Sequence, residues 1–124
     1  MLFAKPLETV IDFLGTTSSA KDEMAALFGD RTAFATPKPM KLIKEFVRAA
    51  SEKESIVLDF FAGSGTTGHA VMDLNKEDGG SRKFILITND ENNICQNITV
   101  PRIRKAIELL GYKESFDFWS KSFI

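Results

Sequence analysis

Residues 56–67 read Ile-Val-Leu-Asp-Phe-Phe-Ala-Gly-Ser-Gly-Thr-Thr, and this stretch decides the fold class. The apolar run at 56–61 has the length of a buried strand and is too short for a helix. Gly63 and Gly65 then permit a tight turn that brings main-chain N–H groups close to a ligand. Helical spacing begins at Thr66, so the turn ends at a helix N-terminus, which favours anions. A strand, a glycine turn and a helix in this order predict the cofactor-binding corner of a doubly wound α/β sheet.

Asp59 lies at the end of the expected strand, four positions before Gly63. A carboxylate here would repel a pyrophosphate, but it would suit a ligand that carries an ammonium group. S-adenosylmethionine has such an amine beside a carboxylate and contains no phosphate, so we expect it as the cofactor. The hydroxyl and N–H groups of Ser64, Thr66 and Thr67 suit the cofactor's carboxylate.

A second interpretation of the same glycines stays open. Gly63, Gly65 and Gly68 also satisfy G-x-G-x-x-G, and Asp90 and Glu91 lie roughly 20 residues on, where a dinucleotide fingerprint has its ribose ligand. The alternative function is therefore a dinucleotide-binding oxidoreductase module. For either cofactor, Asp90 or Glu91 is our candidate for a bidentate ribose contact, because both follow the second expected strand.

The remaining pattern predicts helices around the two strands. We expect helices at 7–14, 19–28, 39–51, 66–75 and 99–110, strands at 56–61 and 84–87, and a loop at 76–81. Ser19 is the expected cap of the second helix. The strand at 84–87 is apolar throughout, as expected for a parallel strand covered on both faces. The aromatic residues after 112 predict a third strand or an apolar edge that needs a partner.

Three single features have structural interpretations. Lys41, Lys44 and Arg48 form a basic stripe on one helix face, which predicts a solvated surface, with phosphate contact as the alternative. His69 is the only histidine, and one turn into a helix it favours a structural role. With a single Cys95 as well, the chain offers neither a metal-ligand cluster nor a nucleophile–base pair.

The composition is that of one modest globular domain. The chain has 124 residues, of which 44% are hydrophobic and 27% charged. No apolar run approaches the roughly 20 residues of a membrane span, and the start lacks a secretory pattern, so we expect a cytoplasmic protein without a membrane partner. The net charge of −1 lacks the basic excess of a self-sufficient DNA binder. Any DNA contact therefore needs a localised patch or another segment.

Four segments together resemble the C-terminal part of a β-class N6-adenine DNA methyltransferase, most like the modification subunit of a type III restriction–modification system. They are Leu-Phe-Gly at 27–29, Thr-Pro-Lys-Pro at 36–39 followed by Leu-Ile, the loop at 59–67, and the stretch 82–102. The resemblance covers about residues 15–110 and implies a partial Rossmann-like sheet with flanking helices. The loop and the resemblance give these candidate cofactor-binding residues: Thr36, Pro37, Lys38, Asp59, Phe60, Phe61, Ala62, Gly63, Ser64, Gly65, Thr66, Thr67, Asp90 and Glu91.

The chain departs from this family in its catalytic residues. The family methylates with an Asp/Asn/Ser-Pro-Pro-Tyr/Phe tetrapeptide that holds the flipped adenine. The four prolines here are at 6, 37, 39 and 101, and no two are adjacent. We therefore expect no catalytic residue in this chain, and no target-recognition region.

The expected identity is a cofactor-binding segment, as a truncated, split or excised piece that is inactive alone. A distant alternative is a non-catalytic fragment that docks on another subunit. We expect one partial domain with a helical lead-in at 1–35, a cofactor-binding core at 36–111 and an aromatic tail at 112–124. The expected partners are double-stranded DNA in the complete enzyme, a catalytic half or restriction subunit, and a second copy at an exposed sheet edge.

Overall fold

The computed structural model describes residues 15–30 and 38–113. The elements in chain order are α1 (Thr17–Phe28), α2 (Met40–Ala50), β1 (Ile56–Asp59), α3 (Thr66–Asp78), β2 (Lys83–Leu86), the 3₁₀-helix η1 (Glu91–Asn93), the π-helix η2 (Cys95–Thr99) and α4 (Val100–Leu110). The helix expected at 7–14 and the aromatic tail from residue 114 onward lie outside the described residues. No helix in the described part is long and apolar enough to cross a membrane.

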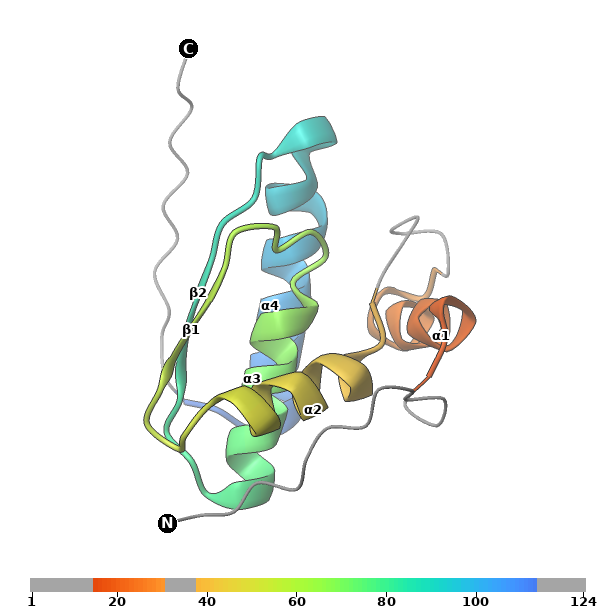
Figure 1. The fold of residues 1–124 in the computed structure, drawn as a ribbon. Helices are drawn as coiled ribbons and strands as arrows, with labels where there is room; N and C mark the ends of the chain where they lie inside the picture. Colours follow the sequence, from red (N-terminus) through yellow and green to blue (C-terminus); the bar gives the residue numbers. More distant parts are fainter. Residues whose placement is uncertain (1–14, 31–37, 114–124) are drawn as a thin grey trace.

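The centre of the fold is a parallel pair of strands, so the class is α/β as predicted. β1 and β2 pair with Val57 opposite Phe84 and Asp59 opposite Leu86. Helices α2, α3 and α4 lie on one side of this pair (Figure 1). Val57 and Phe84 pack there against Val47 of α2 and against Val71 and Leu74 of α3. Both carboxyl ends therefore point to the same edge, where the glycine loop begins.

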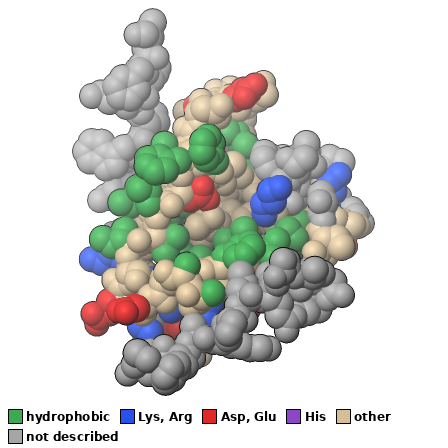
Figure 2. Space-filling view, in the orientation of Figure 1, with side chains coloured by type: hydrophobic (Ala, Val, Ile, Leu, Met, Phe, Trp, Pro, Cys, Tyr) green, Lys and Arg blue, Asp and Glu red, His purple; other side chains and the backbone are tan. Residues whose placement is uncertain are grey.

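The other face of the sheet is open, which corrects the expectation of strands covered on both faces. Leu58 is 48% exposed and Ile85, directly opposite it, is 51% exposed. Ile56 and Ile87 extend the same exposed apolar surface. Figure 2 shows hydrophobic side chains along the strand side of the molecule. Alternation along each strand puts every second residue on this face, so half of each apolar strand has no partner in the described structure.

The helix limits follow local capping chemistry. Thr16, not Ser19, is the N-cap of α1, and the two side chains form a capping box in which Ser19 is the third helical residue. Gly29 ends α1 in the left-handed conformation, as predicted. α3 continues through Asp78, beyond the expected end at Asn75, and stops at Gly79. Arg82 holds this last turn through an ion pair with Asp78 at 2.9 Å.

Gly68 lets α3 approach the sheet and α4 closely. A Cβ at this position would lie 2.8 Å from Ile103 Cδ1, 3.0 Å from Leu86 Cδ1 and 3.0 Å from Phe84 Cε2. Because such separations are shorter than real carbon contacts, a side chain here would force its neighbours apart. The third glycine of the G-x-G-x-x-G pattern therefore serves helix–sheet packing.

The basic stripe on α2 is mostly paired with acids of α3. Lys44 lies 2.8 Å from Asp73 and 3.0 Å from Glu77, and Arg48 lies 3.1 Å from Glu77. These pairs join the two helices, so the simple solvated-face interpretation is wrong for Lys44 and Arg48. Lys41 is exposed.

Candidate cofactor-binding site

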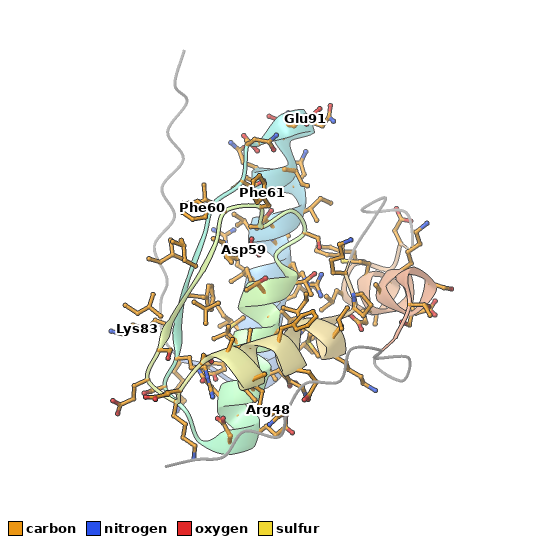
Figure 3. The ribbon with its side chains drawn as sticks, in the orientation of Figure 1. Arg48, Asp59, Phe60, Phe61, Lys83 and Glu91 are labelled. Atoms are coloured by element: carbon orange, nitrogen blue, oxygen red, sulfur yellow. The ribbon has the colours of Figure 1, made fainter. Side chains whose placement is uncertain are left out.

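The carboxylate of Asp59 links the end of β1 to the start of α3. Its Oδ1 accepts the Phe61 N–H at 2.9 Å, and its Oδ2 accepts the Thr67 hydroxyl at 2.6 Å. The strand ends at Asp59, because its side chain turns the chain immediately after it. Figure 3 shows Asp59 with Phe60, Phe61 and Glu91 towards the carboxyl end of the sheet, while Arg48 and Lys83 lie towards the other end.

The helix that follows begins with free main-chain donors. Gly65 is the N-cap, at φ +83°, and no side chain caps it. The first helical hydrogen bond runs from the His69 N–H to the Gly65 carbonyl at 3.3 Å. The amides of the three residues between them precede this bond, as in every α-helix. The Asp59 carboxylate, which can accept from an ammonium group, is thus hydrogen-bonded to the first turn of α3, whose N–H groups can donate to a carboxylate. These two kinds of group fit the amine and the carboxylate at the methionine end of S-adenosylmethionine.

The hydroxyls of Ser64 and Thr66 face the protein interior. Both side chains are buried, and their oxygens lie 3.2 Å from each other. Arg102 Nη1 donates to Ser64 Oγ at 3.2 Å and to Thr66 Oγ1 at 3.0 Å. These hydroxyls therefore support the loop from beneath, and what the two residues can offer a ligand is their main chain.

The two phenylalanines of the loop point outward. Phe60 is 60% exposed and Phe61 is 92% exposed (Figure 3). Phe61 is therefore not a core residue in the described structure, and its ring is accessible to a ligand. Ala62 is buried, and its N–H donates to the Ile87 carbonyl at 3.0 Å. This bond fixes the loop to the end of β2.

Asp90 and Glu91, the two acids after β2, differ in what their side chains contact. Asp90 Oδ1 accepts the Cys95 N–H at 2.9 Å, so this carboxylate stabilises the start of η2. Glu91 is exposed at the tip of the molecule (Figure 3). Asp90, Asn92 and Asn93 all have positive φ angles, of 50°, 56° and 56°. Such strained backbone is uncommon outside glycine and concentrates at functional sites. Of the two acids, Glu91 has the freer carboxylate for a ribose.

The Lys-Pro segment reaches the glycine loop through its backbone. Thr66 Oγ1 donates to the Lys38 carbonyl at 3.4 Å, and the Lys38 side chain is exposed. Pro39 is buried and is the N-cap of α2. Thr36 and Pro37 lie outside the described residues, so their assignment stays a prediction.

Two residues near the start of α4, Thr99 and Arg102, support the glycine loop. The sequence did not connect either of them with the site. Thr99 Oγ1 donates to the Gly63 carbonyl at 2.5 Å. Arg102 is fully buried beneath Ser64 and Thr66. The sequence carries one signal for this position, because Arg102 shares an inward helix face with Ile103 and Ala106.

His69 is a structural residue, as predicted. Its Nδ1 accepts from Arg102 Nε at 3.5 Å. Burial, followed by the nearby Arg102 charge, lowers the pKa of His69 to about 4, so the ring is neutral at pH 7. Burial also lowers the pKa of Arg102 to about 10, while Glu23 opposes that shift, and the guanidinium stays charged at pH 7.

An apolar groove of about 410 Å³ lies between α2 and β1, and Asp59 and Thr67 belong to its lining. Ile43, Phe46, Val57 and Leu58 are among the apolar residues that line it. In the described structure β1 pairs only with β2, so its other edge is open beside this groove. No group of three His, Cys, Asp or Glu side chains among residues 15–30 and 38–113 is placed to hold a metal ion.

Comparison with known proteins identifies the family of this chain. Residues 4–101 match the model of the DNA methylase family, and the chain belongs to that family. It is 51% identical over 87 residues to the type III restriction-modification enzyme StyLTI Mod subunit of Salmonella typhimurium, covering 70% of this chain and 13% of the relative.

Two further relatives carry the same likeness. The EcoPI Mod subunit of Escherichia phage P1 is 42% identical over 106 residues, or 86% of this chain and 15% of that subunit. The type II methyltransferase M.KpnI of Klebsiella pneumoniae is 43% identical over 74 residues, or 60% of this chain and 18% of the relative. The chain thus spans only a small part of these proteins. The resemblance to type III modification subunits is confirmed.

Proposed function

We propose that this chain is the S-adenosylmethionine-binding segment of a site-specific DNA methyltransferase that modifies adenine N6 in a restriction–modification system. The observation that carries the proposal is the Asp59 carboxylate hydrogen-bonded to Thr67, in the first turn of α3, at 2.6 Å. Membership of the DNA methylase family and likeness to Mod subunits support it.

In this proposal, Asp59 accepts the cofactor's amine and the amides at the start of α3 take its carboxylate. Glu91 binds the ribose hydroxyls, and the exposed ring of Phe61 packs on the ligand. The cofactor supplies an electrophilic methyl group when it is bound. The chain's own residues bind and orient that group, and such positioning supplies a large share of catalysis when two substrates must meet.

The adenine side of the reaction belongs to another segment. These 124 residues contain no Pro-Pro pair that could hold the adenine amino group. We propose that a catalytic half, which also contacts double-stranded DNA, packs on the open edge of β1 and the uncovered face with Leu58 and Ile85. Without it, this apolar surface favours self-association. In this proposal the two strands are part of a larger Rossmann-like sheet.

Titration calorimetry tests the ligand. S-adenosylmethionine or its demethylated product should bind the purified chain, and NAD should give no heat of binding. Affinity is expected to be modest, because any contacts from a catalytic half are missing. Binding of NAD with no response to either methionine cofactor would instead support the dinucleotide interpretation of the glycines.

A further inference from the structure

We infer that Arg102 is a positioning residue that holds the glycine loop in its binding conformation and ties it to α1. The part of this inference that concerns cofactor binding rests on the proposed function. The part that concerns the loop conformation of the free chain does not depend on it. Arg102 lies on α4, 38 residues after Ser64, and it is 0% exposed. It therefore acts on a ligand only through other residues.

The guanidinium contacts several segments at once. Nη1 donates to Ser64 and Thr66 in the loop, at 3.2 Å and 3.0 Å, and it also lies 3.4 Å from Met24 Sδ of α1. Nε donates to His69 of α3 at 3.5 Å. A planar fork of five donors can serve diverging partners in this way, and a lysine ammonium cannot.

Among the described residues, Glu23 is the opposite charge nearest to Arg102 that forms an ion pair with it. Glu23 Oε2 of α1 lies 3.8 Å from Nη2, and Nη2 has no hydrogen-bond partner among the described residues. The Glu23 carboxylate also accepts the Met40 N–H, at 3.0 Å from Oε2. Glu23 therefore connects α1 to the start of α2 and to Arg102. The Thr66 hydroxyl also contacts the segment before α2, because it donates to the Lys38 carbonyl.

A buried arginine is a poor choice for simple packing. Taking a charge out of water is costly, and an apolar side chain of similar volume would fill the space without that cost. The cost is offset here by hydrogen bonds to the two loop hydroxyls and to a neutral histidine. Without Arg102, the buried Ser64 and Thr66 oxygens would keep only each other and the Lys38 carbonyl. The arrangement favours a role in fixing the loop around Gly65, whose φ of +83° lies in the left-handed region that favours glycine.

Amide hydrogen exchange on the free chain provides the first test. The Gly65 N–H bonds to the Ala62 carbonyl within the loop, at 2.8 Å, and the Ser81 N–H bonds to the Lys53 carbonyl at the other end of the sheet, at 2.7 Å. Arg102→Met should accelerate exchange at Gly65 about tenfold or more and leave Ser81 unchanged. Lys105→Met, which removes an exposed charge from the same helix, is the control and should change neither amide.

The pattern of exchange separates positioning from general stability. Equal acceleration at Gly65 and Ser81 would mean that Arg102 only stabilises the whole fold, and no acceleration would mean that the loop does not depend on it. Either result overturns the inference. If Arg102→Met does not fold, Arg102→Lys serves in its place, because it keeps the charge and loses the fork. It should give the same local pattern to a smaller degree.

Calorimetry with S-adenosylhomocysteine tests the link to the cofactor. Arg102→Met should weaken binding about tenfold or more under conditions where the chain is folded. In a Ser64→Ala/Thr66→Val background the same change should weaken binding less than threefold, because the route through the hydroxyls is already gone. Full additivity would overturn the inference. If the unmodified chain shows no binding, the proposed function fails, and hydrogen exchange still decides the role of Arg102.

Discussion

At the scale of a single residue, the structural role of Asp59 and its proposed role towards the cofactor can be separated. Asp59→Asn keeps the shape and one acceptor for the Phe61 N–H, but it removes the charge that would face the cofactor's amine. A charge-assisted hydrogen bond contributes about 1.5–3 kcal/mol, so cofactor affinity should fall about tenfold or more. Thr67→Val removes the hydroxyl that donates to Asp59 and leaves the Asp59 charge, so cofactor affinity should fall by less than about threefold. Calorimetry that gives equal losses for both variants would contradict a direct role for the Asp59 charge.

His69 makes stability depend on pH. Its pKa is about 4 in the folded chain and 6.5 in its reference state, so the unfolded chain binds a proton first as the pH falls. The stability due to the neutral ring is therefore complete above about pH 6.5 and is lost progressively towards pH 4. The loss amounts to at most about 3 kcal/mol.

A matched variant isolates this contribution. His69→Asn keeps an acceptor for Arg102 Nε and cannot titrate. Urea unfolding of both proteins gives the difference between their free energies of unfolding, in which the contributions of the shared carboxylates cancel. Any stability that the native histidine adds over His69→Asn should decrease as the pH is lowered from 7 to 4. A constant difference across that range would mean that His69 is not buried in neutral form.

Residues of the glycine loop are predictable because their chemistry is local. Asp59 before Gly63 and Gly65 predicts both a turn and a ligand type from neighbouring positions; the turn is confirmed, and the ligand type stays a prediction. The inward direction of the Ser64 and Thr66 hydroxyls is not predictable in this way, because it depends on Arg102, far along the chain. Likewise, the neutral state of His69 follows from burial, which no local pattern specifies.

At the scale of elements, Gly68 fixes the distance between α3 and its neighbours. Gly68→Ala gains up to about 1 kcal/mol of helix propensity. It also brings a methyl group within 3.0 Å of three side chains at once, and such overpacking costs about 1–3 kcal/mol. We expect a net destabilisation of about 1 kcal/mol by urea unfolding. In an Ile103→Val background, which removes the nearest carbon, the loss should be smaller, and an alanine that stabilises the chain would contradict the close packing.

Elements with strong periodicity and caps were predictable, and irregular ones were not. The helices predicted at 66–75 and 99–110 are present as α3 and α4, and each buries residues at helical spacing: Ala70, Val71 and Leu74 in α3, and Ile103 and Ala106 in α4. The start of α4 at Val100 after Thr99, and its end at Gly111, also match. The π-helix at 95–99 was missed, because π-helices are rare and their hydrogen bonding leaves no clear sequence pattern. The end of α3 was missed because Lys-Glu-Asp at 76–78 suits both a loop and a helix.

At the scale of the whole molecule, we expect the open face of the sheet to control association. Ile85 is 51% exposed on that face, so Ile85→Lys should reduce self-association without a large change in the free energy of unfolding. Leu109→Lys places the same charge at an apolar residue of α4 that is 68% exposed, and it serves as the control. Sedimentation velocity over a range of concentrations measures the effect. If both variants change association equally, the sheet face has no special role.

The last prediction concerns activity, because in the proposed function the chain holds one side of a two-substrate reaction. The candidate cofactor residues at 59–67 and at 90–91 follow the carboxyl ends of β1 and β2, while no adjacent prolines exist to hold an adenine amino group. Positioning both substrates supplies much of the rate of such a transfer, and losing one of them removes most of that advantage. The purified chain should therefore incorporate no labelled methyl group into DNA.

Activity should appear only when a segment with the Pro-Pro tetrapeptide is supplied in trans. The Asp59→Asn chain with the same supplement is the control, and it should restore little activity, because its cofactor affinity is reduced. Ile85→Lys should also restore little, since the added charge lies on the face proposed for docking. Label on adenine N6 from the unsupplemented chain, above a mock purification, would mean that residues other than the tetrapeptide hold the base.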